Sequence, residues 1–474
     1  MRVLLIMPNY GIRSYKLWNY GHIFPPLGLE YIAAYIEDLA EVRLIDNRLK
    51  SANLMVVEKL IKKFRPNYVG ISCNYSFQAY VTYKIASLAK IHGSKTIIGG
   101  WHPTLVPNEM LESDSVDMIV RGEGEMAFRE LIQKNSPVGV LGLSYKQDGK
   151  QIHNPDRELL DLKQIRAPTR KFRSATAKAT YNFFGFPLDC IEISRGCPYS
   201  CSFCCIHKFY RHKYRNRAIP DIVKELSSRE IKDRASLIFF VDDNFMVDPK
   251  YVVELCDAII QNGIKMFLKT QVRVDSVVKY PEVFKKMADA GFLFLFLGFE
   301  SFSDRTLKRL NKQFKVKDIK SAIKILHDLG YIIQGNVILG ADLEDTKKDL
   351  ESTIKIAKTL DVDMLTFTLL TCYPGTKLME HIQKEDLLLT KDWRNFNQLA
   401  PIIKYPYLTS GDLKYYLAKA YKEITFFDNP IKRFGNSIKV RGWGFFISRM
   451  SQMNQIKMIP QLIKNLPSII RKYR

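Results

Sequence analysis

Four cysteines crowd into residues 197–205 of this chain, and Cys197, Cys201 and Cys204 have the spacing CxxxCxxC. Thiolates are the natural ligands of iron–sulfur clusters. Three ligands leave one iron of a four-iron cubane without a protein ligand, so a small molecule could bind there. A structural zinc site normally has a second CxxC pair to close its shell, and no such pair is present. The spacing therefore predicts a redox-active cluster with one vacant coordination position.

The remaining cysteines do not extend this set. Cys205 is too close to Cys204 to span a cubane, so we expect a neighbour rather than a ligand. Cys372 follows a predicted strand and could donate hydrogen to a radical, although an unreactive buried thiol is the favoured interpretation. The others are scattered along the chain, and eight cysteines in a chain expected to be cytoplasmic do not indicate a disulfide framework.

Two series of alternating strand and helix patterns must position these residues. The first series, over residues 1–145, has apolar, β-branched strands and predicts a doubly wound parallel sheet. A polar and basic connector is expected over 146–185. The second series, over 186–400, contains six strand–helix units, two fewer than a complete barrel. It predicts a partial (βα)6 barrel of the TIM type, with the cysteine loop directly after its first strand, where barrel active sites lie.

The segment CPYSCSFC resembles the CxxxCx(aromatic)C pattern of the radical S-adenosylmethionine (radical SAM) superfamily, with Phe203 as the aromatic residue. The later segments GFES (298–301), ILGADLEDT (338–346) and YPGT (373–376) resemble landmarks of the same family. This resemblance covers roughly residues 185–400. It implies a [4Fe–4S] cluster that binds and cleaves S-adenosylmethionine to a 5′-deoxyadenosyl radical. It also implies an external electron donor, a flavodoxin or a ferredoxin.

From the motif match, five residues at strand ends are candidate S-adenosylmethionine contacts. Glu300 could accept hydrogen bonds from the ammonium group or the ribose hydroxyls. Each of the five could instead be a helix N-cap or a member of a structural ion pair. The resemblance leaves the residues that act on the substrate unknown. The five candidates are Asp242, Asp243, Arg273, Glu300 and Ser301.

The N-terminal domain resembles the cobalamin-binding domain of one large branch of the superfamily. The resemblance rests on PPLGLEYIAAYI, GGWHPT (99–104) and RGEGE (121–125), and it makes His102 a candidate corrin contact. However, the DxHxxG motif, which supplies a cobalt-ligating histidine in many cobalamin proteins, is absent. Cobalamin would therefore bind without that ligand, or the domain would serve as a ligand-free wall of the substrate site.

Composition predicts an anionic partner and gives no sign of a membrane-spanning segment. The formal net charge is +23, apolar residues make up 46% of the chain, and no segment is long and apolar enough to span a membrane. Residues 401–474 are expected to form a helical region. Its last part, 431–474, carries ten Lys or Arg and no Asp or Glu, with apolar residues at helical spacing from Ile459. This tail predicts peripheral contact with an anionic membrane on its cytoplasmic face; nucleic-acid binding and docking onto the barrel are the alternatives.

The overall layout resembles enzymes that modify hydrophobic substrates: hopanoid C-3 methylases, tetraether-lipid ring synthases and the anaerobic magnesium-protoporphyrin ester cyclase. The leading hypothesis is therefore a lipid-modifying enzyme that forms a ring by making a carbon–carbon bond. Cobalamin-dependent methylation of a lipid or a tetrapyrrole is the alternative. A third hypothesis, an iron–sulfur sensor that binds nucleic acid, fits poorly with an open cluster site inside a barrel.

Overall fold

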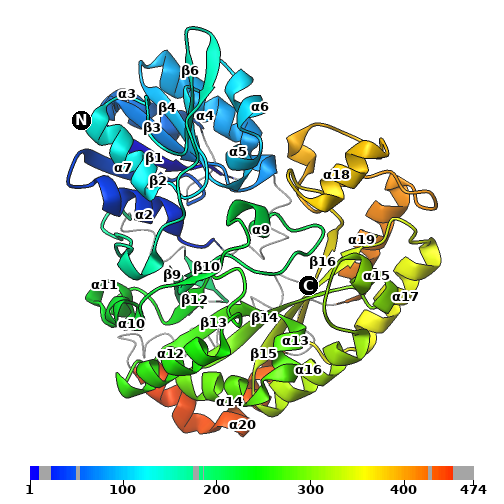
Figure 1. The fold of residues 1–474 in the computed structure, drawn as a ribbon. Helices are drawn as coiled ribbons and strands as arrows, with labels where there is room; N and C mark the ends of the chain where they lie inside the picture. The colour runs from blue at the N-terminus through cyan, green and yellow to red at the C-terminus, as the bar shows by residue number, and fades with distance from the viewer. Residues whose placement is uncertain (10–22, 50–53, 174–180, 185, 425–429, 452–474) are drawn as a thin grey trace.

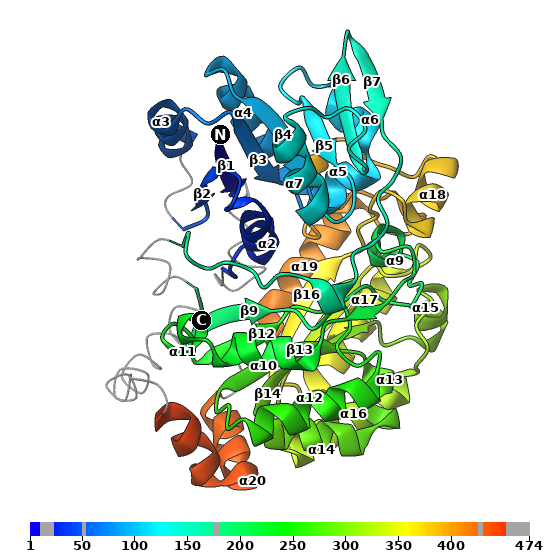
Figure 2. The same ribbon diagram turned by 60° about the vertical axis from the view of Figure 1, so that its left-hand side comes forward.

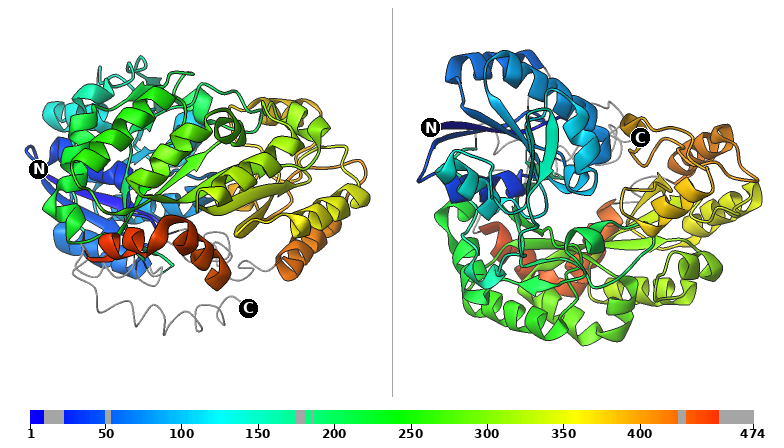
Figure 3. Two further views of the ribbon diagram at one scale, coloured as in Figure 1. Left: turned by 90° about the horizontal axis from the view of Figure 1, so that it is seen from below. Right: turned by 45° about the horizontal axis from the view of Figure 1, so that its top comes forward.

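The structure, a computed structural model, has two lobes (Figure 1). The smaller lobe contains the N-terminus, and the larger lobe is a curved sheet covered by helices on its outer side (Figures 1 and 3). Among the described residues, no helix combines the length and the apolar character needed to cross a bilayer. The structure describes residues 1–9, 23–49, 54–173, 181–184, 186–424 and 430–451.

A seven-stranded sheet with the order β2-β1-β3-β4-β5-β6-β7 forms the N-terminal lobe. Its first five strands are parallel, and alternate side chains of β1 enter different cores. Leu5 packs with helices α2 and α7, whereas Leu4 packs with α3 and α4 on the other face. This burial of both faces is the pattern expected for a doubly wound sheet. The parallel strands are β1 (Arg2–Met7), β2 (Glu41–Asp46), β3 (Tyr68–Ser72), β4 (Lys95–Gly99) and β5 (Met118–Val120).

Helices on both faces, with short helices at the strand ends, complete this lobe. They are α2 (Leu27–Ile36), α3 (Leu54–Phe64), η1 (Ser76–Gln78), α4 (Ala79–Ile91), α5 (Trp101–Leu105), α6 (Pro107–Glu112) and α7 (Glu125–Lys134).

The sheet continues beyond residue 145, where the sequence suggested a connector. Strands β6 (Leu143–Gln147) and β7 (Lys150–His153) form an antiparallel hairpin at its edge. The two turn residues, Asp148 and Gly149, both have positive φ, +49° and +74°. Asp-Gly is a favoured pair for such a turn, so the hairpin has a clear local cause. The chain then reaches the barrel through η2 (Leu162–Gln164).

Six parallel strands form the curved sheet of the larger lobe, in the order β16-β15-β14-β13-β12-β9, and a short antiparallel strand β8 closes one edge. The predicted fold class, a doubly wound sheet followed by a partial six-unit barrel, is thus confirmed. The strands are β8 (Asn182–Phe183), β9 (Phe186–Ile191), β12 (Leu237–Phe240), β13 (Phe267–Val272), β14 (Phe292–Glu300), β15 (Ile332–Leu339) and β16 (Met364–Leu369).

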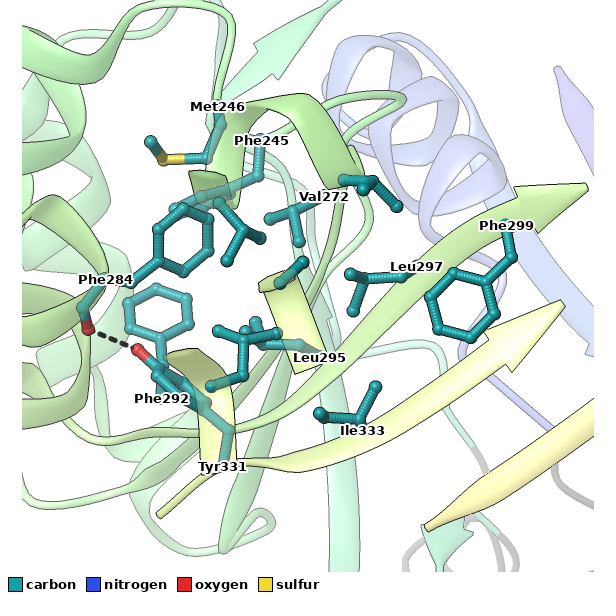
Figure 4. Close-up of a cluster of buried hydrophobic side chains, with 14 of the residues drawn as sticks. Phe245, Met246, Val272, Phe284, Phe292, Leu295, Leu297, Phe299, Tyr331 and Ile333 are labelled. Atoms are coloured by element: carbon teal, nitrogen blue, oxygen red, sulfur yellow. Dashed lines mark hydrogen bonds between the residues drawn. The ribbon is translucent and has the colours of Figure 1, made fainter. Parts of the chain in front are cut away.

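Helices cover the outer face of the barrel sheet over a large apolar core (Figure 4). Leu295 and Leu297 of β14 point into this core together with Phe284 of α14. The Tyr331 hydroxyl, buried in the same core, donates to the Phe284 carbonyl oxygen at 2.6 Å, so its polar atom is satisfied. The covering helices are α10 (Ile219–Ser227), α11 (Arg229–Lys232), α12 (Pro249–Gln261), α13 (Val274–Lys279), α14 (Pro281–Ala290), α15 (Asp304–Arg309), α16 (Val316–Asp328), α17 (Lys347–Thr359) and α19 (Ser410–Glu423).

Helix α20 (Pro430–Ser451) packs on the barrel at the side away from the N-terminal lobe (Figures 1 and 2). Phe446 is buried there among side chains from the amino-terminal ends of the strands. Arg441 donates to the carbonyl oxygen of Phe292 at 2.7 Å, and Arg449 donates to that of Met266 at 3.3 Å. This part of the basic tail therefore docks onto the barrel. The amphipathic helix predicted from Ile459 lies outside the described residues.

Buried ion pairs join the two lobes in two places. In the first, Arg195 of β10 (Ser194–Arg195) contacts Glu123 at 2.9 Å and Glu125 at 2.7 Å, both from the N-terminal lobe, and also Glu192. Arg215 of β11 (Arg215–Asn216) binds Glu123 as well, at 2.9 Å. The acidic residues of the RGEGE segment therefore bind the barrel lobe.

The second place involves Arg170 and Arg173, from the chain between the lobes. Arg170 binds Asp189 of β9 at 3.2 Å and Glu225 of α10 at 2.7 Å. Arg173 binds Asp189 at 2.7 Å and also pairs with Glu30 of α2. All five side chains are nearly inaccessible to solvent. Buried charges are tolerated when they are paired, so the lobes and the connecting chain depend on one another.

Replacing Arg170 by Met should lower the free energy of unfolding by about 3–5 kcal/mol, because Asp189 and Glu225 would lose a buried partner. Urea unfolding followed by circular dichroism measures the change. The control is Arg229→Met, which removes an ion pair to Asp233 from a side chain that is 93% exposed. That variant should unfold like the parent protein. Equal midpoints for the two variants would contradict the structural role of Arg170.

Candidate active site

The three cysteines lie on the loop after β9 and β10, at the carboxyl end of the barrel sheet. Cys201 is buried, and Cys197 and Cys204 are partly exposed. Gly196, directly before Cys197, has a φ of +92° and passes so close to the Lys213 carbonyl that any side chain would overlap with it. Glycine at this position thus allows the loop to turn above the strand ends.

Within the described residues, no three His, Cys, Asp or Glu side chains converge on one point as a single metal ion requires. In a cubane cluster each thiolate binds a different iron atom, so the ligands surround the cluster instead of one ion. The role of the three cysteines as cluster ligands stays a prediction at this point.

Arg273 provides positive charge beside this loop. Its Nη1 lies 3.8 Å from the Cys201 Sγ, and its guanidinium lies over the Tyr199 ring, 3.7 Å from the centroid. Asp275 fixes the guanidinium through hydrogen bonds of 2.9 Å from Nε and Nη2. A cation in this position favours the thiolate form that iron requires.

Burial has the opposite effect on the cysteines themselves. It raises the pKa of the Cys197 thiol and raises that of Cys204 well above its usual value. Without iron both are therefore neutral at physiological pH, and bound iron would supply the charge that stabilises their thiolates.

Asp242 and Asp243 hold the start of the cysteine loop. The Ile193 and Ser194 amides donate to Asp242 Oδ1 at 3.1 and 2.6 Å, and the Gly196 amide donates to Asp243 Oδ2 at 3.1 Å. Burial raises the pKa of both carboxyl groups to about 7. Their observed contacts are those of positioning residues, and the role of each toward S-adenosylmethionine stays a prediction.

Glu300, at the end of β14, has a strained backbone with a φ of +63° beside a register shift between Gly298 and Glu300. Lys312 donates to Glu300 Oε1 at 2.8 Å, and both side chains are only 9% exposed. A Cβ at Gly298 would overlap with the Glu300 carboxylate, so the glycine leaves room for it. Strain of this kind persists where the surroundings hold it, and it gathers at functional sites.

Ser301 has a local structural contact. Its Oγ accepts a hydrogen bond from the Ser303 amide at 3.2 Å, just before α15. Its predicted contact with S-adenosylmethionine is not tested by this geometry.

A cavity of about 290 Å³ opens inside the barrel between the cysteine loop and the strands. Glu300 and Phe203, the aromatic residue of the cysteine motif, both line it. Apart from Glu300, the lining contains no charged residue; it combines apolar side chains with amides and hydroxyls. The uncharged polar members are Gln271, Gln334, Asn336, Thr366, Thr368, Thr371, Tyr373 and Gln398.

The motif search missed these polar lining residues, although a signal exists in the strands. In MFLKTQV, IIQGNVIL and MLTFTLL a polar residue recurs at every second position near the strand's carboxyl end. Since alternate residues of a strand share a face, this pattern predicts a polar stripe on one face. It does not by itself identify that face as the interior of the barrel.

The N-terminal lobe approaches the cysteine loop from above. Helix α5, which follows β4, contacts α9 (Ile206–Phe209), and the rings of Trp101 and Phe209 lie 6.3 Å apart. Segment η1, which follows β3, contacts η3 (Trp393–Asn395) beyond the barrel. The carboxyl end of β4 thus lies near the helix that follows the cysteines, and the carboxyl end of β3 lies near η3.

His102 is buried in this contact region at 2% exposure, with its ring 4.8 Å from that of Trp393. Neither ring nitrogen has a hydrogen-bond partner among the described residues, and burial lowers its pKa to about 4. A neutral imidazole with two unsatisfied nitrogens is a candidate for a ligand contact. Its predicted role as a corrin contact remains a prediction.

Gly100, two residues earlier, packs against the chain after β3. A side chain there would overlap with Asn74 and the Cys73 carbonyl. Its φ of +116° gives a second reason for glycine. At Gly100 the chain after β4 therefore passes very close to the chain after β3.

Comparisons with known proteins agree with this geometry. Residues 191–357 match the model of the Radical SAM superfamily, and residues 17–132 match that of the B12 binding domain. An uncharacterized methyltransferase of Pyrococcus horikoshii is 32% identical over 438 residues, which cover 91% of this chain and 93% of that protein. The chain belongs to the radical SAM superfamily.

Two other relatives have more specific names. The anaerobic magnesium-protoporphyrin IX monomethyl ester cyclase of Rubrivivax gelatinosus is 25% identical, over 91% of this chain and 80% of that protein. The hopanoid C-3 methylase of Methylococcus capsulatus is 27% identical, over 78% and 71%. The cobalamin-dependent radical enzyme OxsB, solved with aqua-cobalamin and S-adenosylmethionine bound, has the same fold. Its TM-score is 0.71 at 19% identity, over 99% of this chain and 75% of that one.

This radical SAM enzyme therefore uses a [4Fe–4S] cluster and S-adenosylmethionine, and its N-terminal lobe is a B12 binding domain. The residues present fit the cluster, because three thiols lie on one loop at the carboxyl end of the barrel sheet and Arg273, from the end of β13, lies beside Cys201. For cobalamin, the contact region contains His102, whose two ring nitrogens have no hydrogen-bond partner among the described residues, and its role as a corrin contact stays a prediction.

Replacing Cys201 by Ser should remove most of the iron from anaerobically reconstituted protein, because a cubane with two thiolates is poorly held. The matched control is Cys205→Ser, which changes a partly exposed cysteine on the same loop at the start of α9. It should retain about the parent's iron and sulfide content, measured by colorimetric assay and electron paramagnetic resonance. Equal iron loss in both variants would mean that Cys205 is a ligand.

Proposed function

We propose that this radical SAM enzyme is a cobalamin-dependent C-methyltransferase. The observation that carries the proposal is that a B12 binding domain faces the cysteine loop, with α5 packed on α9. A corrin held at the carboxyl ends of the N-terminal strands would lie near the cluster and the mouth of the barrel cavity.

Methyl transfer has more support than ring formation, the leading hypothesis from the sequence. The Pyrococcus horikoshii relative is named a methyltransferase, and the Methylococcus capsulatus relative a hopanoid methylase. The Rubrivivax gelatinosus cyclase keeps ring formation as the second candidate. The coarser function, radical chemistry with S-adenosylmethionine, is common to both.

Each group of site residues would have a separate role. Cys197, Cys201 and Cys204 would hold the cluster, and Arg273 would stabilise its thiolates. Glu300, held by Lys312, would accept hydrogen bonds from S-adenosylmethionine. The apolar and amide lining of the cavity would orient the substrate and exclude water. Cobalamin, when bound, supplies a carrier for the methyl group. An external flavodoxin or ferredoxin would supply electrons.

Deuterium labelling distinguishes the two candidates. Cells with and without the gene are grown on methionine with a deuterated methyl group, and their lipids and tetrapyrroles are compared by mass spectrometry. Methylation predicts a gene-dependent product that retains the whole deuterated methyl group. A gene-dependent product that has lost hydrogen without gaining the label would support ring formation instead. Purified enzyme that releases no 5′-deoxyadenosine would refute radical chemistry altogether.

We also propose that α20 makes peripheral contact with an anionic membrane. Trp443 and Ile447 are 64% and 57% exposed, and they lie four residues apart after the break at Gly442. Residues with this spacing share a helix face. Apolar anchors beside basic residues are typical of helices that lie on anionic bilayers.

A double variant, Trp443→Ser with Ile447→Ser, should bind vesicles of phosphatidylglycerol and phosphatidylcholine about tenfold more weakly in a sedimentation assay, because two apolar anchors are lost. Tyr407→Ser is the control, since Tyr407 is equally exposed, at 62%, but lies away from α20. Unchanged binding of the double variant would refute this membrane contact.

A further inference from the structure

Lys269 occupies an unusual place on the inner face of the barrel sheet. It lies in β13 between Phe267 and Gln271, which share its face, and it is only 3% exposed. Its Nζ lies 3.3 Å from the Gln334 Oε1. Both Gln271 and Gln334 line the barrel cavity. The ammonium group thus lies just beneath the cavity floor.

Two aromatic rings also lie near its ammonium group. The Nζ lies 4.6 Å from the centroid of the Phe183 ring and 5.4 Å from that of Phe239. Below it, the inner face is apolar and is closed by Phe267 and by Phe446 of α20. Ring faces stabilise a cation only partly. The cavity side is therefore the direction from which a stronger partner can come.

A second buried lysine of the barrel, Lys312, has a carboxylate partner. Lys312 is 9% exposed and pairs with Glu300 at 2.8 Å. Burial lowers the pKa of Lys312, but the Glu300 carboxylate more than offsets this, and the pKa is raised. Among the described residues, Lys269 has no carboxylate partner, and burial lowers its pKa to about 7. Lys312 thus has an ion-pair partner within the protein, whereas Lys269 has none among the described residues.

An unmatched ammonium group at a cavity floor is suited to an anionic ligand. The cavity lining contains no Arg or Lys, and its one carboxylate, Glu300, is already paired. A single positive charge therefore balances a single negative charge, which favours a carboxylate over a phosphate dianion. The amide of Gln334 beside it can donate a further hydrogen bond.

We propose that Lys269 binds a carboxylate group of the substrate at the floor of the barrel cavity. The substrate class is then an amphiphile with one carboxylate placed deep in the barrel and an apolar or amide-bonding body directed toward the cysteine loop. This inference rests on the proposed function only in taking the barrel cavity as the substrate site. Lys269 is in this view a specificity-determining residue.

The test uses the reconstituted enzyme with S-adenosylmethionine, and hexanoate as the probe, with hexanamide and inorganic phosphate as comparisons. Hexanoate should raise the melting temperature of the parent enzyme, and hexanamide at the same concentration should not. The Lys269→Met variant should bind hexanoate about tenfold or more weakly by calorimetry, because it lacks the ion pair. Lys285→Met, on α14 outside the barrel, is the control and should bind like the parent.

A second measurement separates a binding role from a structural one. Without any ligand, Lys269→Met should melt at a higher temperature than the parent, because it removes an unmatched buried charge. A lower melting temperature, together with equal hexanoate binding, would show that Lys269 only supports the fold and would overturn the proposal. Stabilisation by phosphate in place of hexanoate would overturn the carboxylate assignment.

Two further results separate this inference from the proposed function. Lys269→Met should bind S-adenosylmethionine as tightly as the parent; a large loss would assign Lys269 to that cofactor and overturn the substrate role. If the deuterated methyl product is found, its unmethylated precursor should contain a carboxylate, and esterifying that group should prevent methylation by the parent enzyme. Methylation of the ester at the parent rate would refute this inference while leaving the methyltransferase function intact.

Discussion

The buried ion pairs of Arg195 connect the two halves of the active site. Arg195 stands directly before Gly196 and Cys197, and its guanidinium binds two carboxylates of the N-terminal lobe, Glu123 and Glu125. Because these side chains are almost completely buried, removing one leaves the others short of a buried partner. The same residues therefore fix both the start of the cysteine loop and the position of the B12 binding domain against the barrel. The methyl transfer proposed above would require the corrin and the radical source to lie close together, and these ion pairs hold the two lobes against each other.

Polarity changes in steps along the inside of the barrel. The amino-terminal end is apolar and is closed by Phe186 and by Phe446 of α20. The middle holds amides and hydroxyls, and the carboxyl end holds Glu300 and Arg273 beside the cysteines. A substrate can therefore enter from the side of the N-terminal lobe, where the cluster lies. Part of the basic tail, helix α20, thus covers the amino-terminal end of the barrel.

Local sequence patterns were sufficient for the fold class and for the family. Strand–helix alternation and the CxxxCxxC spacing both depend on neighbouring residues. The Asp148–Gly149 hairpin is also a local signal, but its polar strands resemble a linker. The ion pairs could not be predicted, since Glu30 and Arg173 lie 143 residues apart and look like ordinary surface charges. The cavity lining was missed because residues from several separate strands and loops contribute to it.

In the GFES segment (298–301), the glycine and the glutamate depend on each other for space. Glu300 has a positive φ, and its carboxylate occupies the space that a side chain at position 298 would need. Lys312 then neutralises the carboxylate and holds it at the cavity edge. Glycine, strained glutamate and lysine thus form one unit, in which each residue requires the others. Among the described residues Lys269 has no such carboxylate partner, and this difference between two buried lysines of one barrel is the basis for proposing a ligand at Lys269.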